Sequence, residues 1–156
     1  MARRRIGTTG WALRGAAAGA AGTTVLNVVT YLDMAVRGRP ASSTPGNTVE
    51  RLAETAHLTV PGQGAKRASR VEGLGALTGL MAGIGVGGLL GLARATGFRA
   101  GPLLTTLIVL VSTNGPMTVL GVTDPRTWSA VDWVSDVVPH LAYAAVVTTT
   151  MDSLER

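Results

Sequence analysis

The residues best suited to chemistry lie near the C-terminal end of the chain and recur at a spacing of four. They are Asp132, Asp136, His140, Thr148 and Asp152. On an α-helix this spacing keeps neighbours on roughly one face, so Asp136 and His140 are expected to touch. A nearby carboxylate favours a protonated imidazole, whereas burial disfavours it. Within a membrane, such a stripe is suited to conducting a proton or cation, or to contacting a substrate.

Three further polar side chains interrupt apolar runs and extend this candidate path. Asn114 precedes Gly115-Pro116 near the middle of one run, where the proline is expected to kink a helix because it removes a backbone donor. Asn27 and Asp33 lie in the second half of an earlier run. The candidate polar path therefore consists of five residues: Asn27, Asp33, Asn114, Asp136 and His140.

A structural interpretation accounts for the positions of the same polar residues without assigning them a role in transport. In it, Asp132 and Asp136 lie among the lipid headgroups, and Asp33 lies at the interface that the first run reaches at its end. His140 is then hydrogen-bonded to a neighbouring helix, as polar side chains inside helical bundles commonly are. The sequence leaves both interpretations open.

Other kinds of chemistry have little support. The chain has no cysteine, which excludes disulfides and thiolate sites. The segment 83–88 matches the dinucleotide-binding fingerprint by spacing, but no strand precedes it and no acidic residue follows at the required distance. His57 stands alone in a polar segment and is expected to face solvent. We therefore predict that the protein is not an enzyme and holds neither a metal ion nor a cofactor.

Four apolar runs must position these residues, at about 15–36, 74–95, 102–122 and 134–151. Each is 18 to 22 residues long, and about 20 helical residues span the hydrocarbon core of a bilayer. The sequence predicts an all-α polytopic membrane protein, a bundle of four transmembrane helices forming a single domain over residues 1–156. In the polar loop 37–70 a short amphipathic helix is expected, capped by Asn47 and Glu50.

Glycine is the most regular feature of the second run. It recurs at every fourth position, and a shorter series lies in the first run. The residues predicted to pack helices are Gly15, Gly19, Gly22, Gly75, Gly79, Gly83, Gly87 and Gly91. A face without side chains lets another helix approach closely. This glycine zipper predicts either close packing within one bundle or association with a second copy.

Composition and charge agree with a membrane environment. Only 15% of the 156 residues are charged, against about 25% in soluble domains, and the net charge is +5. The arginines flank apolar runs and form no interleaved basic face, so no nucleic-acid partner is expected. Positive charges divide seven to seven between the two predicted sides. The cluster Arg3-Arg4-Arg5 precedes the first run, which favours cytoplasmic termini.

Two segments carry a resemblance to a known group. They are residues 37–43, Arg-Gly-Arg-Pro-Ala-Ser-Ser, and residues 132–143, which open the last run. In these segments and in its layout, the chain resembles uncharacterised four-span integral membrane proteins of actinobacteria. More distantly it is similar to YagU-like inner-membrane proteins, which have been associated with acid tolerance. The resemblance implies a bacterial inner-membrane protein and carries over no catalytic residue.

Two functional hypotheses follow. The first is a multi-pass protein of the bacterial plasma membrane with a structural or accessory role, whose partners are the lipid bilayer and a second copy or another membrane protein. The second is a small permeation protein that moves protons, ions or a solute along the polar stripe. Under the first hypothesis, replacing His140 costs stability, and under the second it abolishes flux.

Overall fold

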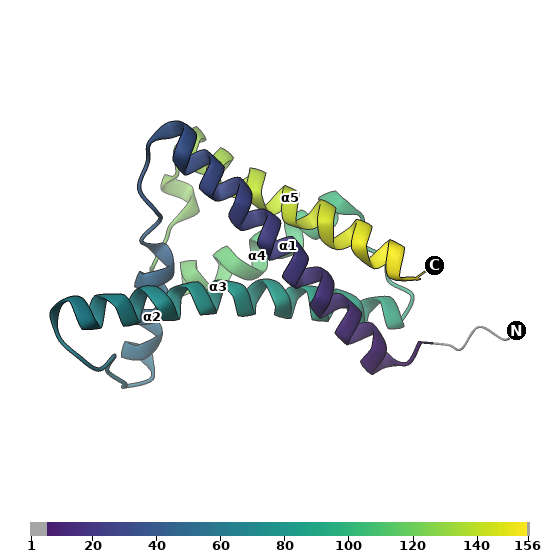
Figure 1. Ribbon diagram of the computed structural model, residues 1–156, viewed down its shortest axis with the longest axis horizontal. Coiled ribbons are helices and arrows are strands. Elements are labelled where there is room, and N and C mark those ends of the chain that lie inside the picture. The colour runs from purple at the N-terminus through teal and green to yellow at the C-terminus, as the bar shows by residue number, and fades with distance from the viewer. Residues whose placement is uncertain (1–5, 156) are drawn as a thin grey trace, which may run out of the picture.

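The computed structural model describes residues 6–155, and over this range every regular element is a helix (Figure 1). The elements are α1 (Thr8–Arg37), α2 (Thr44–Thr55), α3 (Gly64–Ala95), α4 (Pro102–Val119), the short 3-10 helix η1 (Pro125–Thr127) and α5 (Ala130–Glu155). The all-α prediction is confirmed. The short helix expected in the first loop is α2.

The four long helices alternate in direction. The beginning of α1 lies against the end of α3, where Trp11 meets Gly91. The last turn of α5 reaches the same place, since Glu155 accepts a hydrogen bond from Arg94. At the opposite end, Arg37 of α1 donates to Ser135 near the start of α5. The end where α1 begins and α5 finishes is called the terminal end (Figure 1), and the opposite end is called the loop end.

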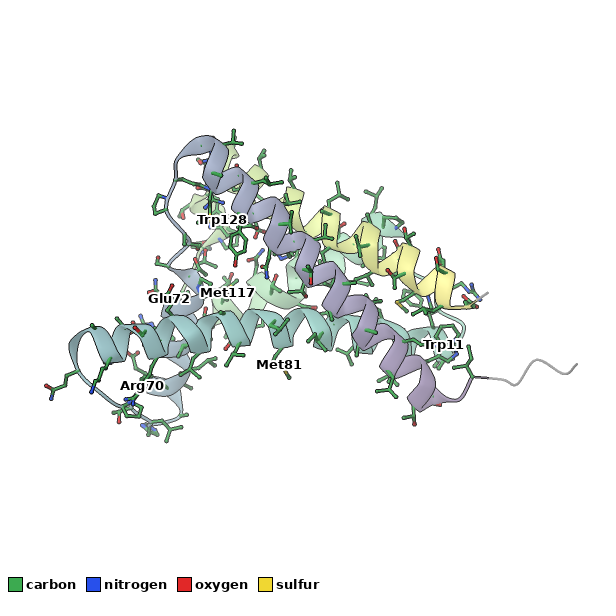
Figure 2. The ribbon with its side chains drawn as sticks, viewed as in Figure 1. Trp11, Arg70, Glu72, Met81, Met117 and Trp128 are labelled. Atoms are coloured by element: carbon green, nitrogen blue, oxygen red, sulfur yellow. The ribbon has the colours of Figure 1, made fainter. Side chains whose placement is uncertain are left out.

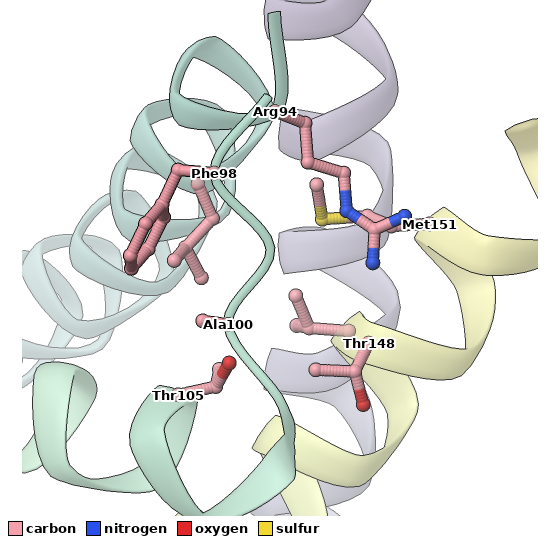
Figure 3. A pocket seen from close by; sticks show the side chains of 8 residues that line it. Arg94, Phe98, Ala100, Thr105, Thr148 and Met151 are labelled. Carbon is pink, nitrogen blue, oxygen red and sulfur yellow. The ribbon is translucent and has the colours of Figure 1, made fainter. Parts of the chain in front are cut away.

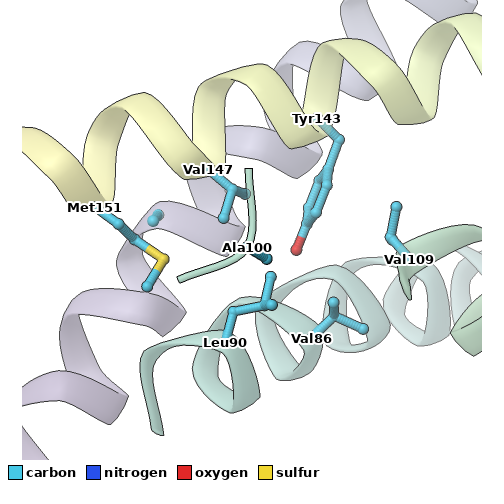
Figure 4. Close-up of a cluster of buried hydrophobic side chains, with 8 residues drawn as sticks. Val86, Leu90, Ala100, Val109, Tyr143, Val147 and Met151 are labelled. Atoms are coloured by element: carbon cyan, nitrogen blue, oxygen red, sulfur yellow. The ribbon is translucent and has the colours of Figure 1, made fainter. Parts of the chain in front are cut away.

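The buried core is small and lies where α1, α3 and α5 converge (Figure 4). Its members are Ala18, Val86, Leu90, Ala100, Val109, Tyr143, Val147 and Met151. Tyr143 is the largest side chain in it and is fully buried. The Tyr143 hydroxyl donates to the carbonyl oxygen of Gly83 over 2.6 Å, which joins α5 to α3. That bond satisfies the one polar atom of the side chain inside an apolar core.

Large apolar side chains on the long helices mostly point outward. On α3 they include Leu77, Leu80, Met81 and Leu89, and Met81 is seen projecting from the helix in Figure 2. Two helices in the described range, α3 and α4, are long and apolar enough to cross a membrane. Only 28% and 17% of their most apolar 18-residue windows are buried. This exposure distinguishes them from the buried core helices of a soluble protein.

The prediction of four membrane spans is therefore supported for two of the four runs. In α1 the run is diluted by glycine, alanine and threonine, which give little apolar area per residue. In α5 it is interrupted by Asp136 and His140. Both helices nevertheless pack along the more apolar pair, α1 against α3 and α5 against α4, and α5 packs still more extensively against α1.

The first loop differs from expectation at both ends. Helix α2 begins at Thr44 with Pro45 in its first turn, a position where the missing N–H of proline costs nothing. Asn47 therefore lies inside the helix, and its predicted capping role is wrong. Helix α3 begins at Gly64, so the polar residues from Lys66 onward are helical and the loop is shorter than 37–70.

Both internal prolines lie within continuous helices. Helix α4 continues past Pro116 to Val119, and α5 continues past Pro139 to Glu155. Each proline removes one main-chain donor from its helix, and the helix continues beyond it.

Candidate functional site

The α4–α5 contact brings together part of the predicted polar path. The Asn114 side chain, 9% exposed, donates from Nδ2 to Oδ2 of Asp136 over 2.8 Å. Asn114 lies on α4 two residues before Pro116, and Asp136 lies in the second turn of α5. The carboxylate thereby gains a donor from another helix, as a partly buried charge requires.

His140 completes this cluster from one turn further along α5. Its Nδ1 lies 2.7 Å from the main-chain oxygen of Asp136 and 3.5 Å from the Oδ1 atom. Both are acceptors, so Nδ1 carries the proton. Nε2 faces the Thr113 hydroxyl at 3.5 Å, while that hydroxyl donates to the Val109 carbonyl at 2.9 Å. The ring is thus held by its own helix through Nδ1 and lies beside Thr113 of α4 at Nε2.

The two remaining path residues lie elsewhere. Asn27 is exposed on α1 and contributes to none of these hydrogen bonds. Asp33 lies in the last turns of α1, where it pairs with Arg39 and with Arg37 at 3.2 Å. Arg37 also donates to Ser135 at 2.7 Å, which links this pair to the residue preceding Asp136. Three of the five predicted residues thus form one cluster, and Asp33 belongs to a neighbouring one.

The spacing-of-four stripe on α5 is divided into separate parts. Asp132 accepts hydrogen bonds from the main chain and hydroxyl of Ser129, which lowers its pKa below the ordinary value. Ser129 in turn accepts from the Asp132 main chain, so the two form a reciprocal cap of α5. Thr148 is buried and donates to Ala144 within its own helix. Asp152 lies at the terminal end with Arg94.

Five of the predicted packing glycines form the closest approach in the molecule. They are Gly15 and Gly19 of α1 and Gly83, Gly87 and Gly91 of α3. A methyl group at position 19 would lie 2.6 Å from the Gly83 carbonyl oxygen, and one at position 87 would lie 2.6 Å from the Gly19 Cα. Both distances are shorter than real Cβ contacts. At positions 15, 19, 87 and 91 the two backbones therefore touch, whereas the Thr23 side chain fills the space that a side chain at position 83 would need.

The other three glycines have different surroundings. Gly22 faces Tyr143 and Val147 of α5, which occupy the space that its own side chain would need. Gly75 lies against the main chain of Pro45, so it packs α2 onto α3. Gly79 has no atom within 4 Å of the position of a Cβ. The row on α3 is therefore used by two partner helices and is left open at one position.

Sequence reasoning did not identify the polar network at the terminal end. The Arg94 side chain, 6% exposed, pairs with Asp152 and with Glu155 at 3.0 Å, and Arg99 also pairs with Glu155. Arg14 donates to the Leu154 carbonyl at 2.6 Å. The sequence contains a signal for this network, since basic residues end the second run and acidic residues end the last. Both ends must meet if successive helices alternate in direction.

Within residues 6–155, no group of three or more histidine, aspartate or glutamate side chains is placed to hold a metal ion. No family model matches the chain, and neither a curated protein nor a solved structure matches it. The resemblance to four-span actinobacterial proteins accordingly stays a prediction, carried by residues 37–43 and 132–143.

Proposed function

We propose that this chain is a small multi-pass membrane protein with a structural or accessory role, whose four long helices all cross the bilayer. The observation that carries the proposal is the outward apolar surface of α3 and α4, whose most apolar windows are largely unburied. Helix α1 follows α3 through glycines, and α5 meets α4 through a hydrogen-bonded cluster. Two less apolar helices thus gain membrane partners for their polar groups.

Packing at both contacts favours a structural role. Where α1 and α3 meet, backbone fills the space that a pore would need. Where α4 and α5 meet, Asn114 donates a hydrogen bond to the Asp136 carboxylate. His140 donates to the main-chain oxygen of Asp136 and lies beside the Thr113 hydroxyl. Polar groups satisfied in this way hold helices together.

Single-cysteine labelling tests directly whether α4 and α5 cross the membrane, because the natural chain contains no cysteine. Thr96→Cys reports the α3–α4 loop, Thr127→Cys reports the α4–α5 loop, and Ser153→Cys reports the end of α5. Four spans place positions 96 and 153 on one side and position 127 on the other. Labelling of position 153 together with position 127 would mean that α5 does not cross. Spheroplasts or oriented vesicles with an impermeant maleimide supply the measurement.

A permeation role is the second candidate, and it draws on one observation. His140 and Asp136 are ionisable groups within the fourth predicted span, and such groups often mark conduction paths. Proton flux into liposomes across pH 5 to 8 distinguishes the two functions. The structural role predicts no flux above protein-free liposomes, and predicts that His140→Ala lowers the thermal midpoint. Flux that His140→Ala abolishes while the fold survives would replace the structural role.

A further inference from the structure

Helix α1 carries a second regular face, on the side that does not contact α3. Six residues recur there at alternating spacings of four and three: Leu13, Ala17, Ala20, Thr24, Asn27 and Tyr31. Ala20 is partly exposed and the other five are exposed. Figure 1 shows α1 in front of α3 and α5, the two helices that it packs against most extensively. We name these six residues the outer seam.

The spacing of the outer seam is typical of a contact with another helix. Alternating steps of four and three average about 3.5 residues, the repeat that keeps one face of a helix against its neighbour in a left-handed pair. Ala17, Ala20 and Thr24 are small, which permits close approach within a membrane. The glycine face of the same helix packs on α3. Helix α1 thus has one face for its own bundle and a second face that lies outside it.

Asn27 lies near the middle of the bilayer if α1 crosses it. The residue is ten positions before Arg37, which bonds Ser135 at the loop end, and thirteen after Arg14, which bonds Leu154 at the terminal end. At a rise of about 1.5 Å per residue, these separations are about 15 and 20 Å. Half of the hydrocarbon core is about 15 Å thick. The Asn27 amide therefore lies at a depth that headgroups and water do not reach.

The Asn27 amide has no hydrogen-bond partner among the described residues, and its side chain is exposed. Thr24, one turn earlier on the seam, donates instead to the Ala20 carbonyl of its own helix. An asparagine amide carries both donors and an acceptor, and hydrocarbon offers no group that can bond them. Leaving the amide unpaired at this depth is costly. A group that both donates and accepts must therefore meet Asn27 from outside the bundle.

The Thr105 hydroxyl also has no hydrogen-bond partner, but its surroundings exclude a second protein. Thr105 is 1% exposed and lines a space of about 10 Å³ inside the bundle. Figure 3 shows its hydroxyl pointing toward the loop that carries Ala100. Such a space holds about one water molecule. Asn27 differs from Thr105 because it faces outward, where a helix of another chain can reach it.

A second copy of the chain supplies the group that Asn27 requires. Because an amide both donates and accepts, two asparagines can bond each other reciprocally. Copies inserted in the same orientation are related by a twofold axis along the membrane normal, which brings residues of equal depth together. Asn27 of one copy then meets the partner's Asn27. A single asparagine within a seven-residue seam fixes the register of two helices in the same way.

We propose that the protein forms a parallel homodimer through the outer seam of α1, joined at mid-depth by reciprocal hydrogen bonds between the two Asn27 amides. This interface rests on the proposed function, because Asn27 needs a partner only where α1 crosses the bilayer. It adds to that function the identity of one partner and the face that binds it. The glycine face of α1 stays within each copy, so dimerisation leaves the bundle unchanged.

Sedimentation equilibrium in density-matched detergent micelles measures the association. The natural chain is expected to dimerise, and Asn27→Leu is expected to raise the dimer dissociation constant about tenfold, the effect of one interhelical polar pair in model peptides. Asn27→Gln keeps a self-complementary amide and is expected to retain the association. Asn47→Leu makes the same substitution at an exposed position of α2 and is expected to change nothing. A natural chain that stays monomeric, or an Asn27→Leu variant that associates equally tightly, would overturn the proposal.

The stability of the single copy is measured separately. Since Asn27 is exposed in the bundle, Asn27→Leu is expected to leave the thermal midpoint unchanged at a protein-to-micelle ratio that keeps the chain monomeric. Lost association with an unchanged midpoint identifies an interface residue, because a residue that merely supports the fold would lower the midpoint. A lowered midpoint of the monomer would overturn the assignment of Asn27 to the interface.

Cysteine cross-linking tests which face of α1 is used, because the natural chain contains no cysteine. Thr24→Cys lies on the outer seam, and oxidation with copper phenanthroline in membranes is expected to join two copies through it. Leu32→Cys, 58% exposed on α1 but off the seam, is the matched control and is expected to stay uncrosslinked. Failure of Thr24→Cys to cross-link, or equal cross-linking at position 32, would overturn the seam as the interface.

Labelling at the two ends of α1 separates this proposal from the proposed function. Thr9→Cys and Ser42→Cys lie in exposed positions at these ends, and an impermeant maleimide reaches them from opposite sides if α1 crosses. Labelling of both from one side would overturn the four-span arrangement and, with it, the dimer. Labelling from opposite sides in a chain that stays monomeric would overturn the dimer alone.

Discussion

The α1–α3 contact and the α4–α5 contact are built from opposite materials. Between α1 and α3 the decisive residues are glycines, and main-chain atoms of one helix fill the space that a side chain of the other would need. Between α4 and α5 the decisive residues are Asn114, Asp136 and His140, and the helices are joined by side-chain hydrogen bonds. The first contact depends on the absence of side chains from the glycines, and the second depends on the hydrogen-bonding groups of the polar side chains.

The difference teaches where each contact is vulnerable. A close backbone approach gains its stability from dispersion over many atoms and fails when any added atom separates the helices. A hydrogen-bonded contact tolerates changes of volume better, but it loses stability when one partner is removed and the other stays buried. The predictions below test this distinction, beginning with the largest expected effect.

Gly87→Leu is expected to have the largest effect. A side chain at this position meets the Gly15 carbonyl and the Gly19 main chain, neither of which can move without displacing α1. We expect a loss of about 3 kcal/mol, the upper end of the typical range for overpacked sites. The measurement is the free energy of unfolding in mixed detergent micelles. Gly79→Leu on the same helix is the matched control, since position 79 is open, and it is expected to stay near zero.

Asn114→Leu is expected to have the next largest effect. It keeps a side chain of similar size but removes the donor to Asp136, which leaves a partly buried carboxylate with one bond fewer. The expected cost is about 1 to 3 kcal/mol in the same unfolding assay. Asn27→Leu, at an exposed position on α1, serves as the comparison and is expected to be neutral. Equal effects of the two substitutions would contradict the assignment of the α4–α5 contact to hydrogen bonding.

Tyr143→Phe is expected to have a smaller effect. It removes the hydroxyl that donates to the Gly83 carbonyl and leaves the ring in the core. Hydrogen bonds between membrane helices contribute about 0.6 kcal/mol on average, so a loss near that value is expected. Tyr31→Phe, on an exposed ring, provides the reference. A loss above that of Asn114→Leu would mean that the α3–α5 hydrogen bond contributes more than the α4–α5 contact.

The smallest expected effect depends on pH and concerns the cap of α5. Because hydrogen bonds from Ser129 lower the pKa of Asp132, the cap stabilises the fold above the ordinary carboxyl pKa. That contribution disappears as the pH falls through the lowered pKa. Thermal midpoints of the natural chain and of Asp132→Asn are therefore expected to converge in acid and to differ at neutral pH. A constant difference across this range would show that the cap does not titrate.

The sequence predicted the positions of the long helices better than it predicted which helices pack together. Periodic apolar runs and glycines at spacing four indicated the long helices, because both signals are local. That Gly15 and Gly19 meet Gly83 and Gly87, whereas Gly75 meets α2, depends on how the helices cross, and no local pattern encodes it. The true cap of α5 was readable, since Ser129-Ala130-Val131-Asp132 has the spacing of a capping box.

The candidate site was predictable in part for the same reason. Asp136 and His140 share one helix, so their contact follows from spacing alone. Asn114 joins them from another helix, and the sequence indicated it only as a polar residue that interrupts an apolar run. Thr105 has no sequence signal, because a threonine that fails to bond its own helix looks like any other until its neighbours are known.

The reliance of α1 on α3 has a consequence for biosynthesis. If all four helices cross the bilayer as proposed, the least apolar pair includes the helix that leaves the ribosome first. Roughly sixty residues separate the end of α1 from the end of α3, which at about 5 to 20 residues per second means a delay of several seconds. During that interval the glycine face of α1 has no partner. Insertion of this protein is thus expected to need a translocon or insertase that retains a weakly apolar segment until its partner is made.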